Sequence, residues 1–261
     1  MSAPRLPVAA LPLLLLIAIT GCGDANDNAA SGRPEVIANL ERQGFEVYGE
    51  FEAPGGLRAF AGLAGQHPVA IYLTPDGEHA IAGTLIDAAG NDAAADELHR
   101  LVAEPMSKKI WQQLDQSHWV RDGQPDAPRV VYVFTDPNCP YCHRFWEAAR
   151  PWVEAGKVQL RHVMVGVVRP DSPNKSAAIL AAEAPEQALV QNELSFDDGG
   201  IRGVAVSAET RAQLDVNERL MRELGFSGTP GILFRDRDGI VQRRSGLPMP
   251  NDMPTVMGPI E

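Results

Sequence analysis

Two cysteines directly after an apolar, β-branched stretch constrain the fold more than any other feature of this sequence. Residues Arg129–Phe134 read Arg-Val-Val-Tyr-Val-Phe and run into the turn-forming Thr135–Asn138, which predicts a buried strand followed by a turn. The motif Cys139-Pro-Tyr-Cys142 follows, and Pro140 is tolerated in the first turn of a helix. Apolar residues then recur at helical spacing at Phe145, Trp146, Ala149 and Trp152. The sequence therefore predicts that the cysteine pair lies at a helix N-terminus.

This position favours redox chemistry for the pair. Unpaired backbone N–H groups and the positive end of the helix dipole stabilise a thiolate at a helix N-terminus. We therefore predict that Cys139 has a lowered pKa and is the nucleophile. Cys142, one turn deeper, is predicted to be the resolving thiol, and Cys139 and Cys142 to form a redox disulfide.

Three other interpretations of the pair stay open. A structural disulfide that closes only two intervening residues adds little stability. A zinc site normally needs four ligands, and His143 and His162 do not complete a known finger spacing. Cys139 to His143 also spell the attachment motif of a c-type haem, but small c-type cytochromes are mainly helical and this motif follows a strand. We expect no metal ion and no cofactor.

A second element, about 90 residues further along, supports a redox dithiol. The residues Gly228-Thr-Pro-Gly231 are similar to the cis-proline loop that thioredoxin-like folds place opposite a Cys-x-x-Cys helix. They precede the apolar run Ile232–Phe234 and a hairpin signature at Asp238-Gly239. The alternative is an ordinary helix stop at Gly225 followed by a turn.

The start of the chain predicts export. The apolar run Leu6–Thr20 is too short to span a bilayer comfortably, so residues 1–21 are predicted to be a signal peptide. The sequence Ile-Thr-Gly-Cys22 is similar to a bacterial lipobox and predicts cleavage before Cys22 with lipid on its sulfur, ordinary signal cleavage being the alternative. Residues 22–33 are predicted to be a flexible tether. Lipidation would account for the odd one of the 3 cysteines.

Composition limits the partners and the number of domains. The chain has 23 Lys and Arg against 34 Asp and Glu, a formal net charge of -11, which argues against nucleic acid or an anionic lipid surface as the main partner. Its 261 residues, 44% of them hydrophobic, are enough for one to two globular domains.

The order of the patterns predicts three parts after the tether. Residues 34–90 predict a small α+β module of one helix and short strands, which is marginal alone and would be stabilised by packing on a second copy. Residues 91–122 predict a linker helix kinked at Pro105, although its apolar stripe could equally be core of the next domain. Residues 123–261 then carry the cysteine pair and the proline loop, with a helical insertion at about 172–226.

In their order, these motifs resemble the DsbC/DsbG family of periplasmic thiol:disulfide interchange proteins, most closely its DsbG branch. The similar stretches are Val131–Cys142, Gly166–Pro173, Asn217–Gly225, Gly228–Pro230, Gly246–Pro248 and Met257-Gly258. The resemblance implies an N-terminal α+β dimerisation module, a linker helix and an α/β thioredoxin-like fold with a helical insertion. It also implies a periplasmic enzyme, tethered to the membrane if Cys22 is lipidated.

The expected activity is thiol–disulfide exchange. We expect Cys139 to attack disulfides, or cysteine sulfenic acids, in exported proteins and Cys142 to resolve the mixed disulfide. The residues expected to tune the dithiol and hold the substrate chain are Pro140, Tyr141, Thr229 and Pro230. The resemblance implies a homodimer, a membrane thiol reductase as electron donor and possible chaperone activity. A disulfide-forming oxidant is the alternative, followed by a c-type haem electron carrier and a non-catalytic holdase.

One position departs from other thioredoxin-like chains. Val133, six residues before Cys139, stands where many cytoplasmic thioredoxins carry a buried aspartate that relays protons. The proton acceptor for Cys142 is therefore left open, with His143 or water as candidates.

Overall fold

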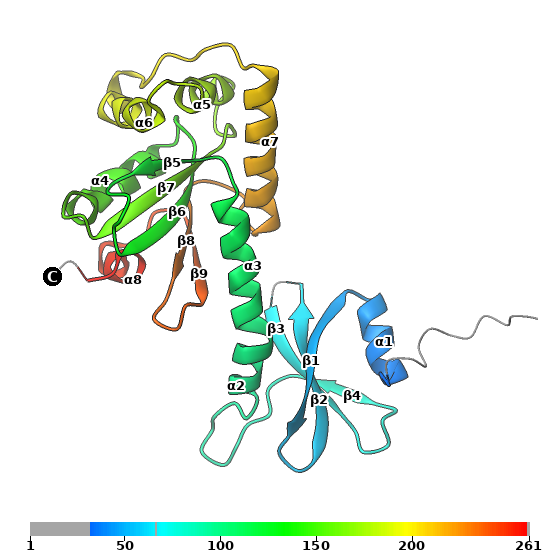
Figure 1. The fold of residues 1–261 in the computed structure, drawn as a ribbon. Helices are drawn as coiled ribbons and strands as arrows, with labels where there is room; N and C mark the ends of the chain where they lie inside the picture. Colours follow the sequence, from blue (N-terminus) through cyan, green and yellow to red (C-terminus); the bar gives the residue numbers. More distant parts are fainter. Residues whose placement is uncertain (1–31, 66, 260–261) are drawn as a thin grey trace, which may run out of the picture.

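Two β-sheets joined by a long helical segment make up the fold (Figure 1). The computed structural model describes residues 32–65 and 67–259. The predicted signal peptide, the lipidation at Cys22 and nearly all of the predicted tether lie outside these described residues. Within the described part, no helix is long and apolar enough to cross a membrane.

The first sheet is antiparallel, in the order β1-β2-β3-β4, and helix α1 packs against it. The elements are α1 (Glu35–Arg42), β1 (Phe45–Ala53), β2 (Leu57–Ala64), β3 (His67–Leu73) and β4 (Ala80–Ala82). Ile37 of α1 is fully buried against Phe60 and Ile71 of the sheet. The last strand is short and ends at Ala82, directly before Gly83, whose φ of 150° favours glycine.

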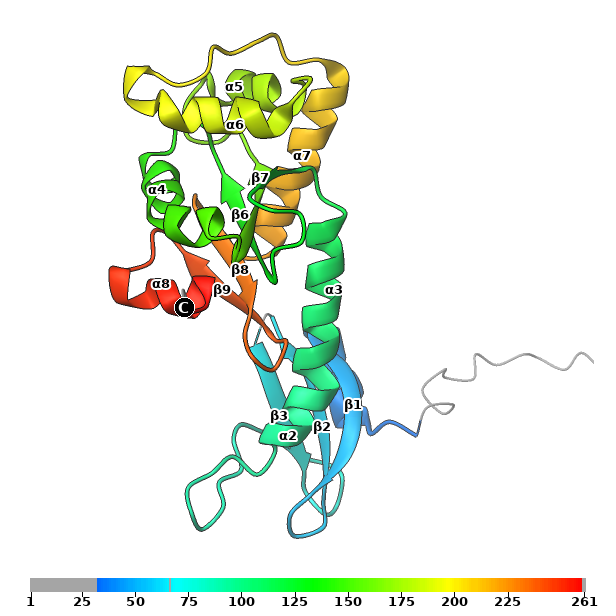
Figure 2. The same ribbon diagram turned by 60° about the vertical axis from the view of Figure 1, so that its left-hand side comes forward.

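A continuous helical column links the two sheets (Figures 1 and 2). It consists of α2 (Ala95–Leu98), a π-helical turn (His99–Ala103) and α3 (Glu104–Asp115). The kink expected at Pro105 takes the form of this wider turn directly before it, since Pro105 has no N–H to donate to the carbonyl four residues back.

The column contributes apolar side chains to both cores. The linker interpretation and the interpretation as core of the next domain therefore each hold over part of its length. Val102 packs with the first sheet, whereas Ile110 and Leu114 pack with the second. The first sheet approaches the column closely at Gly49, where a Cβ would lie 2.8 Å from Leu101 Cδ2. A larger residue at position 49 would require the Leu101 side chain to shift.

The second sheet has the order β5-β7-β6-β8-β9, with β6 parallel to β7 and antiparallel to β8. Its strands are β5 (Trp119–Asp122), β6 (Arg129–Thr135), β7 (Val158–Met164), β8 (Gly231–Arg235) and β9 (Val241–Ser245). Side chains along β6 alternate between two cores, because successive residues of a strand point to opposite faces. Val131 and Val133 pack under α4 (Pro140–Glu154) and α8 (Met253–Met257), which a 3₁₀ turn (Pro250–Asp252) precedes. Tyr132 and Phe134 pack under α3 and α7 (Ala208–Glu223).

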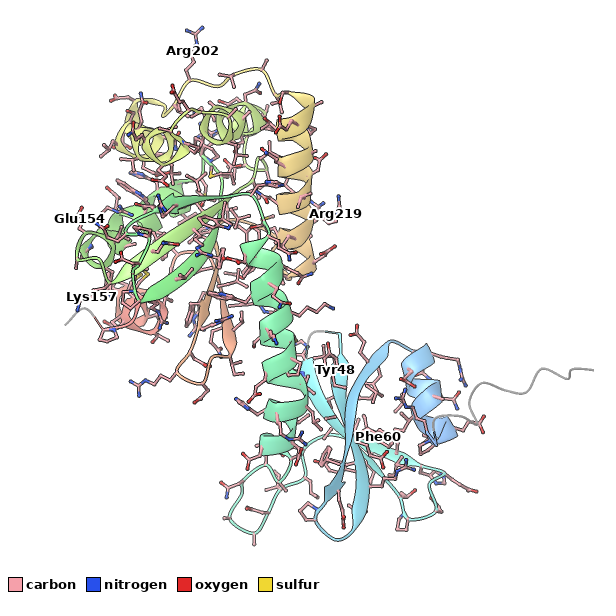
Figure 3. The ribbon with its side chains drawn as sticks, in the orientation of Figure 1. Tyr48, Phe60, Glu154, Lys157, Arg202 and Arg219 are labelled. Atoms are coloured by element: carbon pink, nitrogen blue, oxygen red, sulfur yellow. The ribbon has the colours of Figure 1, made fainter. Side chains whose placement is uncertain are left out.

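Helices inserted between β7 and β8 cover the end of this sheet and, through α7, part of one face (Figure 2). They are α5 (Ser172–Leu180), α6 (Pro185–Leu194), a 3₁₀ turn η3 (Phe196–Asp198) and then α7, whose N-cap Ser207 accepts the Thr210 N–H. In Figure 3, Arg202 marks the end of the molecule furthest from the first sheet, which carries Tyr48 and Phe60. The predicted helical content of this region is confirmed.

Helix α7 is fixed to the second sheet by Asn217, which offers a test of the fold. Its fully buried amide accepts the His118 N–H at 3.0 Å and donates to the carbonyls of His118 and Met164 at 2.8 and 2.9 Å. We expect Asn217→Ala to lower the free energy of unfolding by about 2–4 kcal/mol, because buried backbone groups lose their partners. Denaturant unfolding measures this, and Arg219→Ala on the exposed side of α7 is the matched control (Figure 3). An equal loss in both variants would contradict the assignment.

Candidate active site

The cysteine pair lies at the N-terminus of α4, as the sequence predicted. Cys139 is the N-cap residue, and its Sγ accepts the Cys142 N–H at 3.2 Å. Pro140 is the first helical residue, where its missing N–H leaves no hydrogen bond unmade. Both cysteines are free thiols and only 3% exposed, while Tyr141 between them is 54% exposed. The thiols are thus covered, and the side chain beside them faces solvent.

The proline loop lies against Cys139. The Thr229–Pro230 peptide bond is cis, and the Cys139 Sγ–H donates to the Thr229 carbonyl at 3.4 Å. The loop leads directly into β8, whose Gly231 pairs with Phe134 at the end of β6. Because β6 also leads into the cysteine motif, the sheet brings together two segments that the sequence separates by 90 residues. The structure therefore places Pro140, Tyr141, Thr229 and Pro230 around one site.

The pKa values of the two thiols are shifted in opposite directions. A hydrogen bond from the Cys142 thiol lowers the pKa of Cys139 to about 6, against the opposing effect of burial and with smaller help from Thr229 and backbone N–H groups. Burial raises the pKa of Cys142 well above its usual value, and the neighbouring Cys139 raises it further. At neutral pH the site therefore holds one thiolate and one thiol.

The loop before Cys139 is held by the buried carboxylate of Asp136. Its Oδ1 accepts the Asn138 N–H at 2.9 Å and the Ser172 hydroxyl at 2.8 Å, while its Oδ2 accepts the N–H groups of Val167 and Val168 at 2.7 and 2.9 Å. The sequence analysis assigned Asp136 only to a turn. Its position between a strand and an Asn is typical of a side chain that hydrogen-bonds to its own backbone. Its hydrogen bonds with residues beyond 164 could not be predicted from the neighbouring sequence.

A groove of about 650 Å³ adjoins the proline loop. One wall is formed by Val167 and Val168, which are 44% and 43% exposed and whose N–H groups donate to Asp136. The opposite wall is formed by the end of α7 and the segment after it, with Arg222 at its surface. Since Thr229 lines the groove and its carbonyl contacts Cys139, the groove is continuous with the site.

The two histidines considered in the sequence analysis have other partners. His143 Nδ1 lies 2.9 Å from Glu193 Oε2 and its Nε2 lies 3.7 Å from Glu147 Oε1, so both ring nitrogens face carboxylates. This geometry does not support His143 as the proton acceptor for Cys142. His162, buried on β7 beside Val133, has its Nδ1 2.8 Å from the Thr135 hydroxyl.

The zinc interpretation fails on geometry in the described part of the chain. The only cluster of three or more potential ligands there is the exposed set Asp76, Glu78 and His79 in the turn between β3 and β4. It includes neither the cysteines nor His143 and His162. The structure therefore does not bring the four residues considered for zinc into one site.

A five-stranded sheet with a Cys-x-x-Cys pair at a helix N-terminus and a cis-proline loop against it defines the thioredoxin-like thiol–disulfide oxidoreductases. Residues 122–258 match the family model described as a thioredoxin-like domain. The chain is 44% identical to the thiol:disulfide interchange protein DsbG of Pseudomonas aeruginosa over 256 residues, covering 98% of this chain and 99% of that protein. It is 41% identical to DsbG of Escherichia coli K12, with 86% and 91% covered.

DsbC proteins are more distant. The DsbC of Escherichia coli K12 is 25% identical over 223 residues, covering 84% of each chain. The chain therefore belongs to the DsbC/DsbG family of thiol:disulfide interchange proteins, on the DsbG side, as the motifs in the sequence indicated. It is a thiol–disulfide oxidoreductase.

The split acidity of the pair can be measured directly. In a Cys22→Ser background, the thiolate absorbance of the reduced protein is expected to rise with a midpoint near pH 6, the pKa of Cys139. Cys142→Ala removes the thiol that donates to Cys139, so the midpoint should move to higher pH. Cys139→Ala should abolish the step near pH 6. A step near pH 6 that persists in Cys139→Ala would show that the low pKa does not belong to Cys139.

Proposed function

We propose that Cys139 and Cys142 are the catalytic dithiol with which this enzyme reduces and isomerises disulfides in exported proteins. The observation that carries the proposal is the opposite shift of the two pKa values at one helix N-terminus. A thiolate attacks and a thiol does not, so Cys139 is poised as the nucleophile and Cys142 stays protonated until it is needed.

The chemistry follows from this division. The Cys139 thiolate attacks one sulfur of a substrate disulfide, the substrate S–S bond breaks, and the other substrate sulfur leaves as a thiolate. Cys142 then loses its proton and attacks the Cys139 sulfur, which releases reduced substrate and leaves an enzyme disulfide. In isomerisation a second substrate thiolate attacks the mixed disulfide instead, and the enzyme leaves reduced. With a sulfenic acid, Cys139 displaces hydroxide, which leaves as water after taking up a proton.

Substrate binding is proposed along the proline loop and the adjoining groove. Main-chain pairing beside Pro230 would hold an extended segment with little regard to its sequence. The valine wall of the groove would contact apolar side chains that flank the substrate cysteine. Pro140 and Tyr141 complete the surface on the other side of Cys139.

We propose that residues 34–90 form a dimerisation module, residues 91–122 its linker and residues 123–261 the catalytic domain. The short strand β4 is an edge of the first sheet, and Ile81 on it is 62% exposed. Ile86, just beyond it, is equally exposed. A second copy of the chain is the partner that would cover these apolar side chains and pair the edge. Chaperone activity is proposed for the cleft of such a dimer.

The proposed location is the periplasm, with a lipid on Cys22 as the membrane tether. A reductase or isomerase that becomes oxidised must be reduced again, so a membrane thiol reductase is proposed as its electron donor.

A disulfide-forming oxidant is the second candidate function. The low pKa of Cys139 stabilises the reduced form, and a dithiol with a stable reduced form is an effective oxidant when it carries its disulfide.

The redox state in cells separates these two functions. Cells are quenched with acid and thiols are labelled with a mass-shifting reagent, in wild type and in single Cys139→Ser and Cys142→Ser variants. Mostly reduced cysteines are expected for a reductase or isomerase, and a mostly oxidised pair would support the oxidant. Cys142→Ser should accumulate mixed disulfides with exported proteins, whereas Cys139→Ser should form none. Unchanged client protection by Cys139→Ala would show that holdase activity needs no thiol chemistry.

The proposed dimer has its own test. Ile81→Lys places a charge on the exposed edge strand, so we expect the particle mass in light scattering to fall from dimer to monomer. Thiolate titration of Cys139 should be unchanged, because that site lies in the other sheet. Glu78→Lys in the neighbouring turn is the matched control and should remain dimeric. A wild-type chain that is already monomeric would refute the dimerisation module.

A further inference from the structure

The helical insertion contacts the first turn of α4 through one side chain that the proposed mechanism does not use. The ring of His143 is held at its edge by Glu193 of α6, with 2.9 Å between Nδ1 and Oε2. Phe196 of η3 stacks on its face, with 4.4 Å between ring centroids and 4° between ring planes. His143 is therefore fixed by two elements of the insertion and has little freedom to turn.

Glu193 is unusual in being a carboxylate that is only 2% exposed. Burying a charge is costly unless it is paired and hydrogen-bonded, so a buried glutamate calls for a partner. Its Oε2 has His143, and its Oε1 accepts the Asn192 amide at 3.3 Å. The same amide lies 3.3 Å from the Pro137 carbonyl, so this cluster also touches the loop that precedes Cys139.

His143 lies on the same side of the helix as Cys139. The two residues are four apart, and the His143 N–H donates to the Cys139 carbonyl at 3.1 Å. Side chains four apart are neighbours on a helix surface, with about 5–6 Å between their Cβ atoms. A charge on His143 therefore lies within about one helical turn of the Cys139 sulfur.

The charged groups around His143 suit the imidazolium. Glu193 faces one ring nitrogen from α6 and Glu147 faces the other from α4 itself, while the rings of Phe196 and Trp146 carry no charge. Two facing carboxylates favour the positively charged form of the ring, although only the contact with Glu193 is short enough for a hydrogen bond. No cation faces His143 in the ion pairs of the described residues.

We propose that Glu193 is a positioning residue that holds His143 as an imidazolium beside Cys139, and that this pair sets the reduction potential of the dithiol. The positive ring stabilises the Cys139 thiolate, so it favours the reduced enzyme and makes the disulfide form more oxidising. The insertion thereby acts on the chemistry although it supplies no reacting group. The proposal rests on Cys139 being the attacking thiol.

The test uses the full chain with Cys22→Ser and compares His143→Gln with His143→Lys. The first removes the charge, and the second keeps a cation without the ring. Two quantities are measured: the midpoint of thiolate formation, and the equilibrium in which enzyme dithiol and oxidised glutathione give enzyme disulfide and two reduced glutathiones. His143→Gln is expected to raise the midpoint by about half a unit or more and to shift the equilibrium toward enzyme disulfide roughly threefold or more. His143→Lys should stay close to wild type.

Glu147→Gln is the matched control, because Glu147 faces the same ring from the exposed side at 3.7 Å, and it should change neither quantity appreciably. Nitrogen NMR of the His143 ring, recorded above about pH 7.5 where an ordinary histidine is neutral, reads its charge independently of both variants, and doubly protonated nitrogens are expected. A neutral ring, or a His143→Gln variant with wild-type midpoint and equilibrium, would overturn the proposal. Either result would leave the proposed function intact, since that function is tested separately, by the redox state of the pair in cells and by substrate trapping in Cys142→Ser.

Discussion

A sulfur atom at a helix N-cap is the interaction on which the arrangement of the second sheet depends. Cys139 Sγ accepts an N–H from the first turn of α4 and donates to the Thr229 carbonyl. Both contacts require β6 to end beneath α4 and β8 to begin beside the end of β6. The strand order, with β6 between β7 and β8, meets that requirement. Backbone groups thus position the Cys139 sulfur, while the hydrogen bond from the Cys142 thiol contributes most to lowering its pKa.

The buried carboxylate of Asp136 stabilises the loop that positions Cys139. Asp136 connects the loop before Cys139 with the loop after β7, and it satisfies donors from both. The same hydrogen bonds present Val167 and Val168 toward the groove. One side chain therefore positions the loop that carries the nucleophile and shapes the neighbouring surface, and its hydrogen bonds offset the cost of burying a carboxyl group there.

Local patterns were sufficient to predict the strand and the helix start, because each depends on residues close in sequence, whereas the proline loop was predicted from its similarity to thioredoxin-like folds and from the distant cysteine pair. The β-branched run before Thr135 and Pro140 after Cys139 are signals of that kind. The contacts of Asp136 with Val167 and of His143 with Glu193 could not be predicted, since their partners lie about 30 and 50 residues away and meet only once the insertion packs on the sheet. Pro105 predicted a disturbance of the column correctly, but the wider turn that results depends on packing against two cores at once, where Met106 contacts both.

The burial of Cys139 has a consequence for which proteins can react. Thiol–disulfide exchange needs the attacking sulfur in line with the bond it breaks, and Cys139 is only 3% exposed beneath the proline loop. A disulfide within a rigid, completed domain cannot be brought into that line without unfolding around it. A cysteine on an unfolded, extended segment can be brought into that line. Steric access to this one sulfur therefore slows the reaction with fully folded chains and favours the reaction with chains that are not yet folded.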